Sequence, residues 1–468
     1  MKIKACLLSL IILAANCFAF GQGQPKRAET GKAEAVAFIN VNVVPMDRER
    51  VIENQTVIVR EGRISEIGPA AKVKVPAGAL RVEARGKYLM PGLAEMHGHM
   101  PHPNLGDKVA GSFLLLFVAN GVTTVRTMYG FANNSIPMRD KVNRGETLGP
   151  KLYVAAPAMT GQSVHSPEEG EKLVRQYKQE GYDLLKIHEG LSLSTYDKIV
   201  ATANQVGLPY GGHIPNDVGL LHALKSKQSS VEHLDGYLEA LEADDSPIRN
   251  ADPMTRAQKL IYNLDDKKIS SLVAATLEAG AWNVPTMALM ATAFSTEGAE
   301  SLRSRPELKY VPPGMVSQWV QQRTNQLKQG GDAEGGARAV EMRDRVLKAL
   351  SDGGAKIMLG SDAPQLFSVP GFSLHREMRA MVKAGMTPYQ VLETGTRNPA
   401  TYLKAEKEFG TVEVGRRGDL ILVDDNPLKD VANVAKRSGV MVRGWWLPET
   451  ELRKMLDDLA ASYAEAKQ

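Results

Sequence analysis

Residues 88–99 read YLMPGLAEMHGH, an apolar run that ends in two histidines separated by one glycine. A short apolar run bounded by turn residues is typical of a strand buried inside a sheet. Side chains two positions apart in a strand share a face, so His97 and His99 point in the same direction where the run ends. Two converging imidazoles are a common beginning of a divalent metal site. We therefore expect this stretch to be a core strand that carries a metal site at its end.

Seven further apolar runs follow the first strand and alternate with helical stretches such as SPEEGEKLVRQYKQEG at 166–181. Strands that alternate with helices form parallel sheets, and eight is the number of strands in a closed (β/α)₈ TIM barrel. We predict an α/β fold with this barrel over residues 90–405. An open doubly wound sheet is the alternative architecture, but no glycine fingerprint for a dinucleotide accompanies it. The seven runs are 121–128, 151–159, 182–190, 208–215, 229–236, 281–289 and 355–364.

Short β-rich runs bounded by glycine and proline occur at both ends of the chain. They are AVAFINVNVVPM at 35–46, QTVIVREGRISEIG at 55–68, GTVEVGRRGDLILVDDNP at 410–427 and VMVRGWWLP at 440–448. We predict that the two ends pair in one small composite β-sandwich domain. The predicted segments are 22–89 and 406–450 for this domain and 451–468 for a C-terminal helix.

The N-terminal segment has the form of a secretory signal peptide over residues 1–21. Lys2 and Lys4 precede an apolar run that is short for a membrane span, and the chain then turns polar. We predict an exported, periplasmic protein with no stable membrane partner; an uncleaved anchor or a lipid on Cys17 is the alternative. Cys6 and Cys17 are the only cysteines. The mature chain would therefore contain no disulfide and no zinc site made of cysteine.

Composition narrows the range of partners. The 468 residues carry a formal net charge of +4, and no run of lysine and arginine forms a basic stripe. Nucleic acid is therefore not an expected partner. Residues 290–349 are longer than a simple barrel connection and are rich in charge. We expect helices there that form a lid or a partner surface, which leaves a homo-oligomer as an option.

Later strands deliver polar residues at the place that His97 occupies in the first one. These residues are Lys186, His213, His233 and Asp362. The carboxyl ends of barrel strands converge on one mouth, so we expect these side chains to be neighbours. Lys186 lies inside an apolar strand, where loss of water lowers the pKa of an amine. A neutral amine can add carbon dioxide to form a carbamate whose oxygens could bridge two metal ions; a lysine paired with a nearby carboxylate is the alternative.

The order H-x-H, Lys, His, His, Asp, with PGLAEMHGHMPH, VEHLDG and LGSDAP, resembles the amidohydrolase superfamily. Within it the chain is most similar to the imidazolonepropionase-related group that includes Xaa-Pro dipeptidase-like amide hydrolases. The resemblance extends to AGMTPYQVLETGTRNPATYL and GTVEVGRRGDLILVDDNPL near the C-terminus. It implies two divalent metal ions, most commonly Zn²⁺. His97, His99 and Asp362 would hold the more buried ion, His213 and His233 the other, and carboxylated Lys186 would bridge them.

The same resemblance implies roles in catalysis. A hydroxide shared by the metals would be the nucleophile, with Asp362 as general base and then acid. His165, in the loop after the third strand, would polarise the scissile carbonyl. His188, on the face of Lys186, would contact substrate or support the lysine. Substrate contacts are also expected of Tyr129, for which Arg126 is the alternative, and of Tyr237, whose hydroxyl could hold a carboxylate.

The sequence thus predicts a metal-dependent hydrolase that cleaves an amide C–N bond of a small molecule, such as a dipeptide or an N-acyl amino acid. A lactone or an organophosphate ester is the alternative substrate, because the same nucleophile attacks either centre. A binding or structural protein is the alternative outside enzymes. HIPND after His213 lacks the glutamate of the H-x-x-E arrangement with which mononuclear deaminases of the superfamily shuttle protons. This absence argues against deamination.

Overall fold

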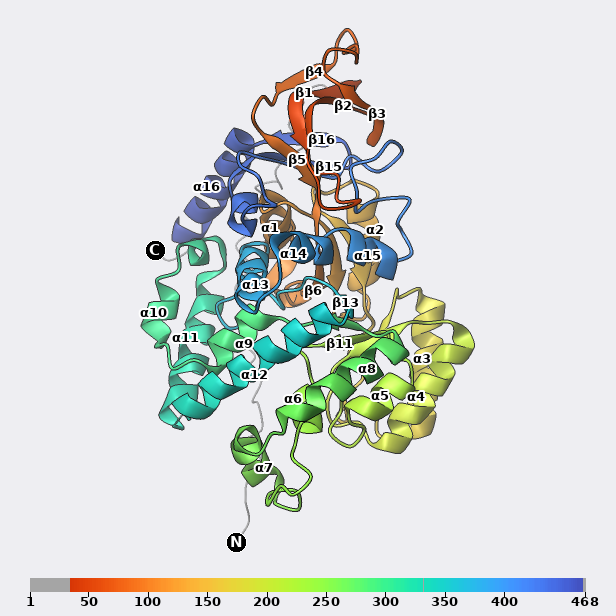
Figure 1. The fold of residues 1–468 in the computed structure, drawn as a ribbon, viewed down its shortest axis with the longest axis vertical. Coiled ribbons are helices and arrows are strands. Elements are labelled where there is room, and N and C mark those ends of the chain that lie inside the picture. Colours follow the sequence, from red (N-terminus) through yellow and green to blue (C-terminus); the bar gives the residue numbers. More distant parts are fainter. Residues whose placement is uncertain (1–33, 331, 466–468) are drawn as a thin grey trace. The chain divides into compact units, whose positions relative to one another are not determined.

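The computed structural model describes residues 34–330 and 332–465 (Figure 1). The predicted signal peptide, residues 1–21, lies outside the described residues. Within the described part of the chain, no helix combines the length and the apolar character needed to cross a bilayer.

An eight-stranded sheet joins the two ends of the chain. Its order is β16-β15-β14-β5-β1-β2-β3, with β4 also paired to β1. Its strands are β1 Ala35–Val43, β2 Ile52–Arg60, β3 Arg63–Pro69, β4 Leu80–Glu83, β5 Tyr88–Pro91, β14 Leu420–Val423, β15 Arg437–Val442 and β16 Trp445–Pro448. Strands β5 and β14 pair antiparallel, with Met90 opposite Ile421, so segments from opposite ends of the sequence share one ladder. The nine residues of β1 are long enough to bond both β4 and β5 along one edge. The two ends of the chain therefore pair in one hydrogen-bonded sheet, and not in the two separate sheets of the predicted sandwich.

The first core strand is shorter than the sequence indicates. Residues 88–98 form two strands, β5 and β6 (Leu93–Gly98), which meet at Gly92. The amide of Gly92 donates to the carbonyl of Asp419, and a Cβ at Gly92 would lie 2.2 Å from Oγ1 of Thr123. This close approach passes the chain from the composite sheet into the parallel strands, so the single strand expected over this stretch is wrong.

Eight parallel strands follow, one for each apolar run of the sequence. They are β6, β7 Val122–Thr127, β8 Lys151–Val154, β9 Leu185–Ile187, β10 Tyr210–Gly212, β11 Ser230–Glu232, β12 Trp282–Val284 and β13 Lys356–Ile357. They are assigned to a three-stranded sheet, β6-β7-β8, and a five-stranded sheet, β13-β12-β11-β10-β9, rather than to one closed barrel. Parallel bridges join residue 155 to residue 184 and residue 159 to residue 187, between β8 and β9. The α/β class and the parallel pairing are thus confirmed.

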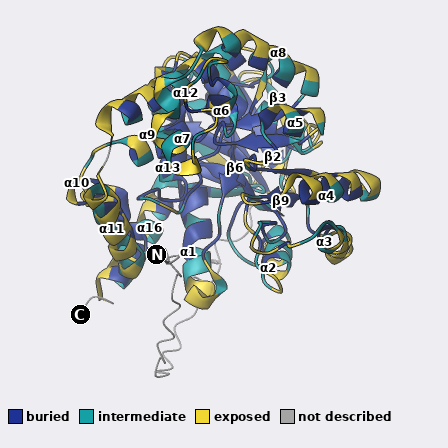
Figure 2. Cartoon of the chain, turned by 90° about the horizontal axis from the view of Figure 1, so that it is seen from below, coloured by how far each residue is buried: buried dark blue, intermediate teal, exposed yellow. Residues whose placement is uncertain are grey.

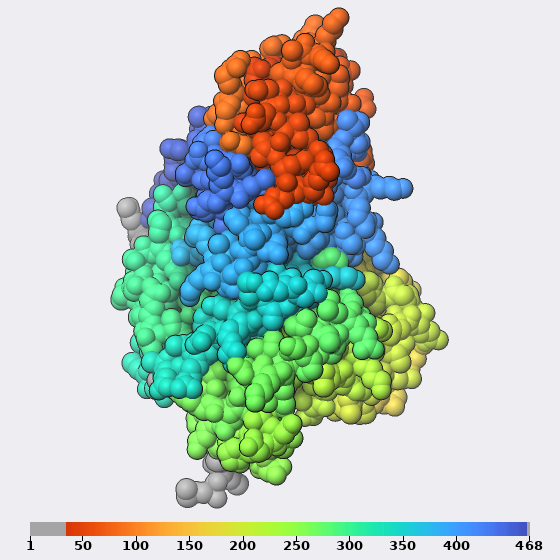
Figure 3. All heavy atoms as spheres, viewed as in Figure 1, coloured from red at the N-terminus to blue at the C-terminus, as the bar shows by residue number. Residues whose placement is uncertain are grey.

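Helices surround these strands (Figure 2). They are α1 Gly106–Ala119, α2 Ser135–Asn143, α3 Pro167–Glu180, α4 Leu193–Val206, α5 Leu220–Lys225, α6 Tyr237–Ala240, α7 Pro253–Lys259, α8 Ile269–Ala279, α9 Met287–Phe294, α10 Ala299–Arg303, α11 Pro313–Lys328, α12 Ala333–Asp352, α13 Phe372–Lys383, α14 Pro388–Thr394, α15 Arg397–Tyr402 and α16 Glu449–Glu465. Helix α3 begins where the hydroxyl of Ser166 accepts from the amide of Glu169, and it ends at left-handed Gly181. Figure 2 shows the strands buried and the outward helix faces exposed, as expected of strands in a core. The charged segment before β13 forms helices α9 to α12, and Figure 3 shows the N-terminal strands in contact with C-terminal segments.

Candidate metal centre

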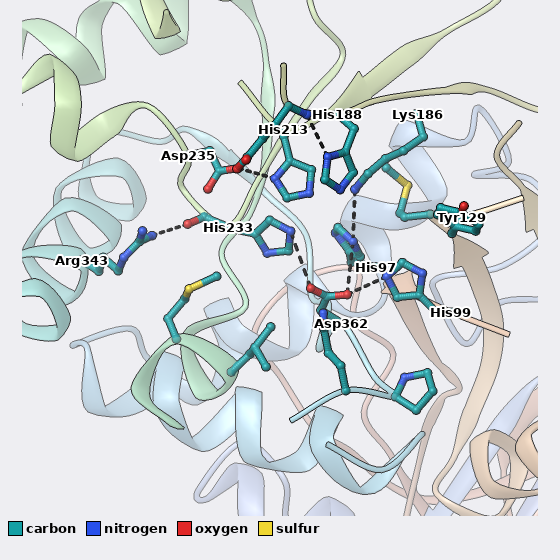
Figure 4. A pocket seen from close by; sticks show the side chains of 16 residues that line it. His97, His99, Tyr129, Lys186, His188, His213, His233, Asp235, Arg343 and Asp362 are labelled. Atoms are coloured by element: carbon teal, nitrogen blue, oxygen red, sulfur yellow. Dashed lines mark hydrogen bonds and ion pairs between the residues drawn. The ribbon is translucent and has the colours of Figure 1, made fainter. Parts of the chain in front are cut away.

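A cavity of about 490 Å³ opens where several of the parallel strands end (Figure 4). Residues that end or directly follow β6, β9, β10 and β11 contribute to its wall, together with residues of the loop after β13. All six residues for which a metal role is predicted line it, namely His97, His99, Lys186, His213, His233 and Asp362. Figure 4 shows their side chains pointing toward one another.

His97, His99 and Asp362 form the tightest group. Each offers one ligand atom, and these atoms lie within 4.8 Å of one another. Nε2 of His99 is 2.6 Å from Oδ1 of Asp362, and Nε2 of His97 is 3.5 Å from the same oxygen. The amide of Asp362 donates to the carbonyl of His97, and its φ of 57° is a left-handed conformation that costs a non-glycine residue energy. The strained backbone at Asp362 thus holds the carboxylate against the two imidazoles.

His213 and His233 extend the group on its other side. The ring of His233 is centred 4.6 Å from that of His97 and 4.8 Å from that of His213. Nε2 of His233 lies 3.6 Å from Oδ2 of Asp362. Asp362 therefore faces three imidazoles, with its two oxygens directed to different histidines.

Hydrogen bonds fix the orientation of three of these imidazoles through Nδ1. Nδ1 of His97 is 2.7 Å from Glu232, Nδ1 of His213 is 2.7 Å from Asp235, and Nδ1 of His233 is 2.8 Å from the hydroxyl of Thr286. An ionised carboxylate only accepts, so the first two Nδ1 atoms carry hydrogen and leave Nε2 with a lone pair. Burial, with nearby cationic groups, lowers the pKa of His97 and His233 well below the ordinary value and that of His213 to about 3. The imidazoles are therefore neutral, the form that binds metal.

Lys186 lies among these imidazoles with 2% of its surface exposed. Nζ is 3.4 Å from Nε2 of His97. Burial lowers the pKa of its amine, against the opposing effect of the Glu232 and Asp362 carboxylates. Among the ion pairs of residues 34–330 and 332–465, none joins Lys186 to a carboxylate. The alternative of a simply paired lysine therefore has no support in the geometry.

A buried network supports His97 from behind. Glu232 accepts from Nη2 of Arg126 at 2.8 Å and from the hydroxyl of Ser230 at 2.6 Å, in addition to its contact with His97. Arg126 is fully buried there and does not line the cavity, whereas Tyr129 lines it and is 42% exposed. Tyr129, and not Arg126, is thus in a position to meet a substrate.

The other predicted site residues divide into two groups. His188 lines the cavity, its ring 4.2 Å from that of His213, and burial lowers its pKa to about 4. His165 is exposed and is absent from the residues that line this cavity. Tyr237 is buried, and its hydroxyl contacts Thr276 at 2.7 Å and donates to Asn283 at 3.0 Å. The expectation that Tyr237 holds a substrate carboxylate is wrong, because its hydroxyl is satisfied inside the core.

Three charged residues of the cavity wall were not predicted. Asp235 lies two positions after His233, and burial raises its pKa to about 6. Its place in VEHLDG is a signal that sequence reasoning could have used, because a carboxylate at a strand end can orient a ligand. Glu189, directly after His188, also lines the cavity. Arg343 comes from α12, far from any strand end, and its sequence neighbourhood gives no such signal.

The donor set fits divalent metal ions. Neutral imidazoles and a carboxylate are ligands that zinc and similar ions accept. The Nδ1 contacts of His97, His213 and His233 fix the orientation of their rings, as hydrogen bonds to the second ring nitrogen do in metal-binding histidines. A lysine ammonium beside such ions would be repelled, so the burial that lowers the pKa of Lys186 is part of the fit.

Comparisons with known proteins identify relatives of this chain. The model of the amidohydrolase family matches residues 88–447. The chain is 24% identical over 435 residues to a 5-methylthioadenosine/S-adenosylhomocysteine deaminase of Caldanaerobacter subterraneus subsp. tengcongensis, covering 83% of this chain and 84% of that protein. It is 26% identical to a dihydroorotase of Pediococcus pentosaceus over 193 residues, which cover 39% of this chain and 43% of that one.

Solved structures resemble the fold over most of the chain. A Xaa-Pro dipeptidase with bound methionine in its active site has a TM-score of 0.64 and 18% identity, over 88% of this chain and all (100%) of that chain. The bottromycin amidohydrolase has a TM-score of 0.67 and 21% identity, over 92% of this chain and 91% of that chain.

Proposed function

Because the chain belongs to the amidohydrolase family and is a metal-dependent hydrolase, we propose that it cleaves the amide C–N bond of a dipeptide or an N-acyl amino acid. The observation that carries this proposal is the buried amine of Lys186 inside a ring of neutral imidazoles. It supports a site for two ions, and the fold likeness to a Xaa-Pro dipeptidase supports an amide as the substrate.

Two ions would be held by different sets of residues. His97, His99 and Asp362 would bind one ion, and His213 and His233 the other. Lys186 would lie between them as a carbamate. Its neutral amine nitrogen would bond the carbon of carbon dioxide and release one proton to water, so an uncharged group would become an anionic one with two oxygens. Zn²⁺ is the proposed metal, since it binds imidazole and carboxylate together.

The residues of this chain would then guide a proton. Bound divalent ions supply a nucleophilic hydroxide near neutral pH by lowering the pKa of water. Asp362, buried against His99 and His97, is placed to accept the proton of the attacking water and to give it to the leaving nitrogen. Tyr129 and His188 would contact the substrate from the cavity wall. His165 would reach the scissile carbonyl only if its loop moves toward the cavity.

The likeness to a deaminase does not extend to the residue that shuttles protons. The residue three positions after His213 is Asn216, and an amide cannot exchange a proton as a glutamate does. Amide hydrolysis therefore remains the proposed reaction, with deamination, lactone hydrolysis and organophosphate hydrolysis as outcomes of the assay below.

We propose that the eight parallel strands close into a (β/α)₈ barrel beside the composite sheet. The amide of Met96 donates to the carbonyl of Leu359, and that of His99 to the carbonyl of Ala363, so the first strand and the residue after it bond the segment that follows the last strand, which supports closure. Export to the periplasm stays a proposal from the sequence of residues 1–21.

Metal content and activity test this function together. Wild type and Lys186→Ala are purified with added zinc, with and without bicarbonate, and their metal is counted by plasma mass spectrometry. We expect about two ions per wild-type chain and a clear loss in the variant. Wild type should hydrolyse dipeptides or N-acyl amino acids in a panel that also holds lactones, phosphotriesters and adenosine derivatives. About one ion per chain, indifferent to Lys186, or cleavage of only the non-amide members, would contradict the proposal.

A further inference from the structure

The long charged segment before β13 contributes to the cavity wall. Leu289 and Met290 come from α9, and Arg343 comes from α12. Figure 4 shows Arg343 reaching the carbonyl of His233. The segment thus brings two apolar side chains and one guanidinium to the cavity.

Arg343 is buried without full compensation of its charge. It is 8% exposed, and Nη1 donates to the carbonyl of His233. Nε is buried and has no hydrogen-bond partner within the described residues. The guanidinium carbon of Arg343 lies over the ring of Phe294, 5.7 Å from the ring centre. Burial of a cation with unused donors is costly unless an anion can join it.

Asp235 and Glu239 act on Arg343 through their charges, but no carboxylate within the described residues forms an ion pair with it. Among the ion pairs of residues 34–330 and 332–465, none includes Arg343. Burial lowers the pKa of Arg343, and the charge of Asp235 opposes that effect more than the charge of any other carboxylate. The Asp235 carboxylate is, however, 2.7 Å from Nδ1 of His213 and serves that imidazole. Among the residues that line the cavity, Arg343 is the only arginine, and Lys186 is the only lysine. A substrate anion that enters the cavity therefore meets one guanidinium, whose charge is permanent, besides any bound metal.

The position of Arg343 suits the leaving half of an amide substrate. Its guanidinium bonds the backbone of His233, the residue whose Nε2 faces Asp362 on the metal side. An amino-acid leaving group carries its carboxylate two bonds from the amide nitrogen that Asp362 would protonate. The guanidinium fork matches a carboxylate geometrically, while Leu289 and Met290 offer apolar contact for a side chain.

We propose that Arg343 binds the free carboxylate of the substrate's leaving amino acid and so selects amides of apolar amino acids over their neutral analogues. This inference rests on the proposed amide hydrolase activity. Under this inference the charged helical segment takes part in substrate selection, a role beyond the lid or partner surface that the sequence suggests.

Paired substrates that differ only in charge test the inference. N-acetyl-leucine and glycyl-leucine are each compared with their C-terminal amides in zinc-loaded wild type, Arg343→Met and Arg343→Lys. We expect wild type to favour each carboxylate in kcat/KM, and the preference to fall roughly 10- to 100-fold in Arg343→Met, with partial recovery in Arg343→Lys. Arg345→Met is the matched control on the same helix, because Arg345 pairs with exposed Asp266 and should keep the wild-type preference.

Binding separates this inference from the proposed reaction. Calorimetric titration of leucine and leucinamide into the same proteins measures the preference for carboxylate without turnover. A carboxylate preference that Arg343→Met loses, in a protein that hydrolyses no amide, would support the anion site and overturn the reaction. An unchanged preference in Arg343→Met, or none in wild type, would overturn the inference. Loss of bound metal in Arg343→Met, also seen in Arg343→Lys, would likewise overturn it in favour of a structural role behind His233.

Discussion

Replacement of Glu232 by glutamine should weaken both the fold and the metal site. The Glu232 carboxylate is fully buried and accepts from Arg126, Ser230 and Nδ1 of His97. Although burial lowers the pKa of Arg126, its ion pair with Glu232 helps to hold that pKa above the ordinary value. Glutamine leaves the buried guanidinium without its anion, and breaking a buried pair costs about 3 to 5 kcal/mol. We expect a loss near the lower bound, about 3 kcal/mol, because the amide oxygen still accepts.

The same substitution should reach the metal through His97. Glutamine can turn its amide nitrogen toward Nδ1, which would then favour the wrong tautomer and place hydrogen on Nε2. Loss of a partner that orients a metal-binding histidine typically costs 10- to 100-fold in affinity, or about 1.4 to 2.7 kcal/mol. This effect should be seen at constant pH in the folded protein, independently of the loss in stability.

Two assays separate these effects. Urea denaturation of the metal-free protein gives the free energy of unfolding, and zinc titration against a chromophoric chelator gives the affinity. Glu334→Gln is the control, since the ion pair that Glu334 forms with Arg338 on α12 is exposed. In the double variant Arg126→Met/Glu232→Gln, the unfolding free energies should not add, because the unpaired cation is gone. Additive losses, or zinc affinity equal to wild type in Glu232→Gln, would refute the reasoning.

Three further predictions concern stability, pH and metal. Tyr237→Phe should lower the free energy of unfolding by about 1 to 2 kcal/mol in urea denaturation and leave kcat/KM unchanged, because it removes hydroxyl contacts in the core; a specific rise in KM would restore Tyr237 to the site. Burial raises the pKa of Glu377 to about 7, so the folded protein binds a proton that the unfolded chain has lost above pH ~4.5. The protonated carboxyl therefore contributes its full stability below pH ~4.5, and this contribution is lost as the pH rises to ~7. The unfolding free energy of wild type, measured relative to that of Glu377→Gln, should therefore fall by about 3 kcal/mol across that pH interval. A difference that does not change with pH would contradict the raised pKa of Glu377. Dialysis against dipicolinate should abolish hydrolysis and lower Tm, and zinc with bicarbonate should restore both; full activity after proven removal of metal would contradict a metal-dependent reaction.

The sequence predicted the residues whose neighbours follow from topology. His97, Lys186 and Asp362 are remote in sequence, yet His97 lies near the end of β6, Lys186 lies in the short strand β9, and Asp362 lies in the loop after β13. The convergence of strand ends therefore predicts their proximity without knowledge of side-chain packing. The paired histidines, the buried lysine and the alternation of strands and helices carried this information.

Other residues depend on details that periodicity does not contain. Tyr237 begins a short helix directly after left-handed Gly236, and this change of direction turns its side chain into the core. Arg343 reaches the cavity from the middle of a helix, at a position set by the packing of α12 on α9. The break at Gly92 depends on contact with Thr123 on a neighbouring strand. Such features follow from tertiary contacts, and one sequence does not encode them as a local pattern.

The charges of the site connect the metal centre with the choice of substrate. Two divalent ions would carry more positive charge than Asp362 and a carbamate on Lys186 cancel, so the centre itself would attract any carboxylate. An amino-acid product could then turn and bind the ions through its own carboxylate, which would inhibit the enzyme. The guanidinium of Arg343, which donates to the backbone carbonyl of His233, offers a competing place for that carboxylate. We therefore expect leucine to inhibit Arg343→Met more strongly relative to its substrate than wild type, measured as the ratio of the inhibition constant to KM; an unchanged ratio would mean that the metal centre alone positions the anion.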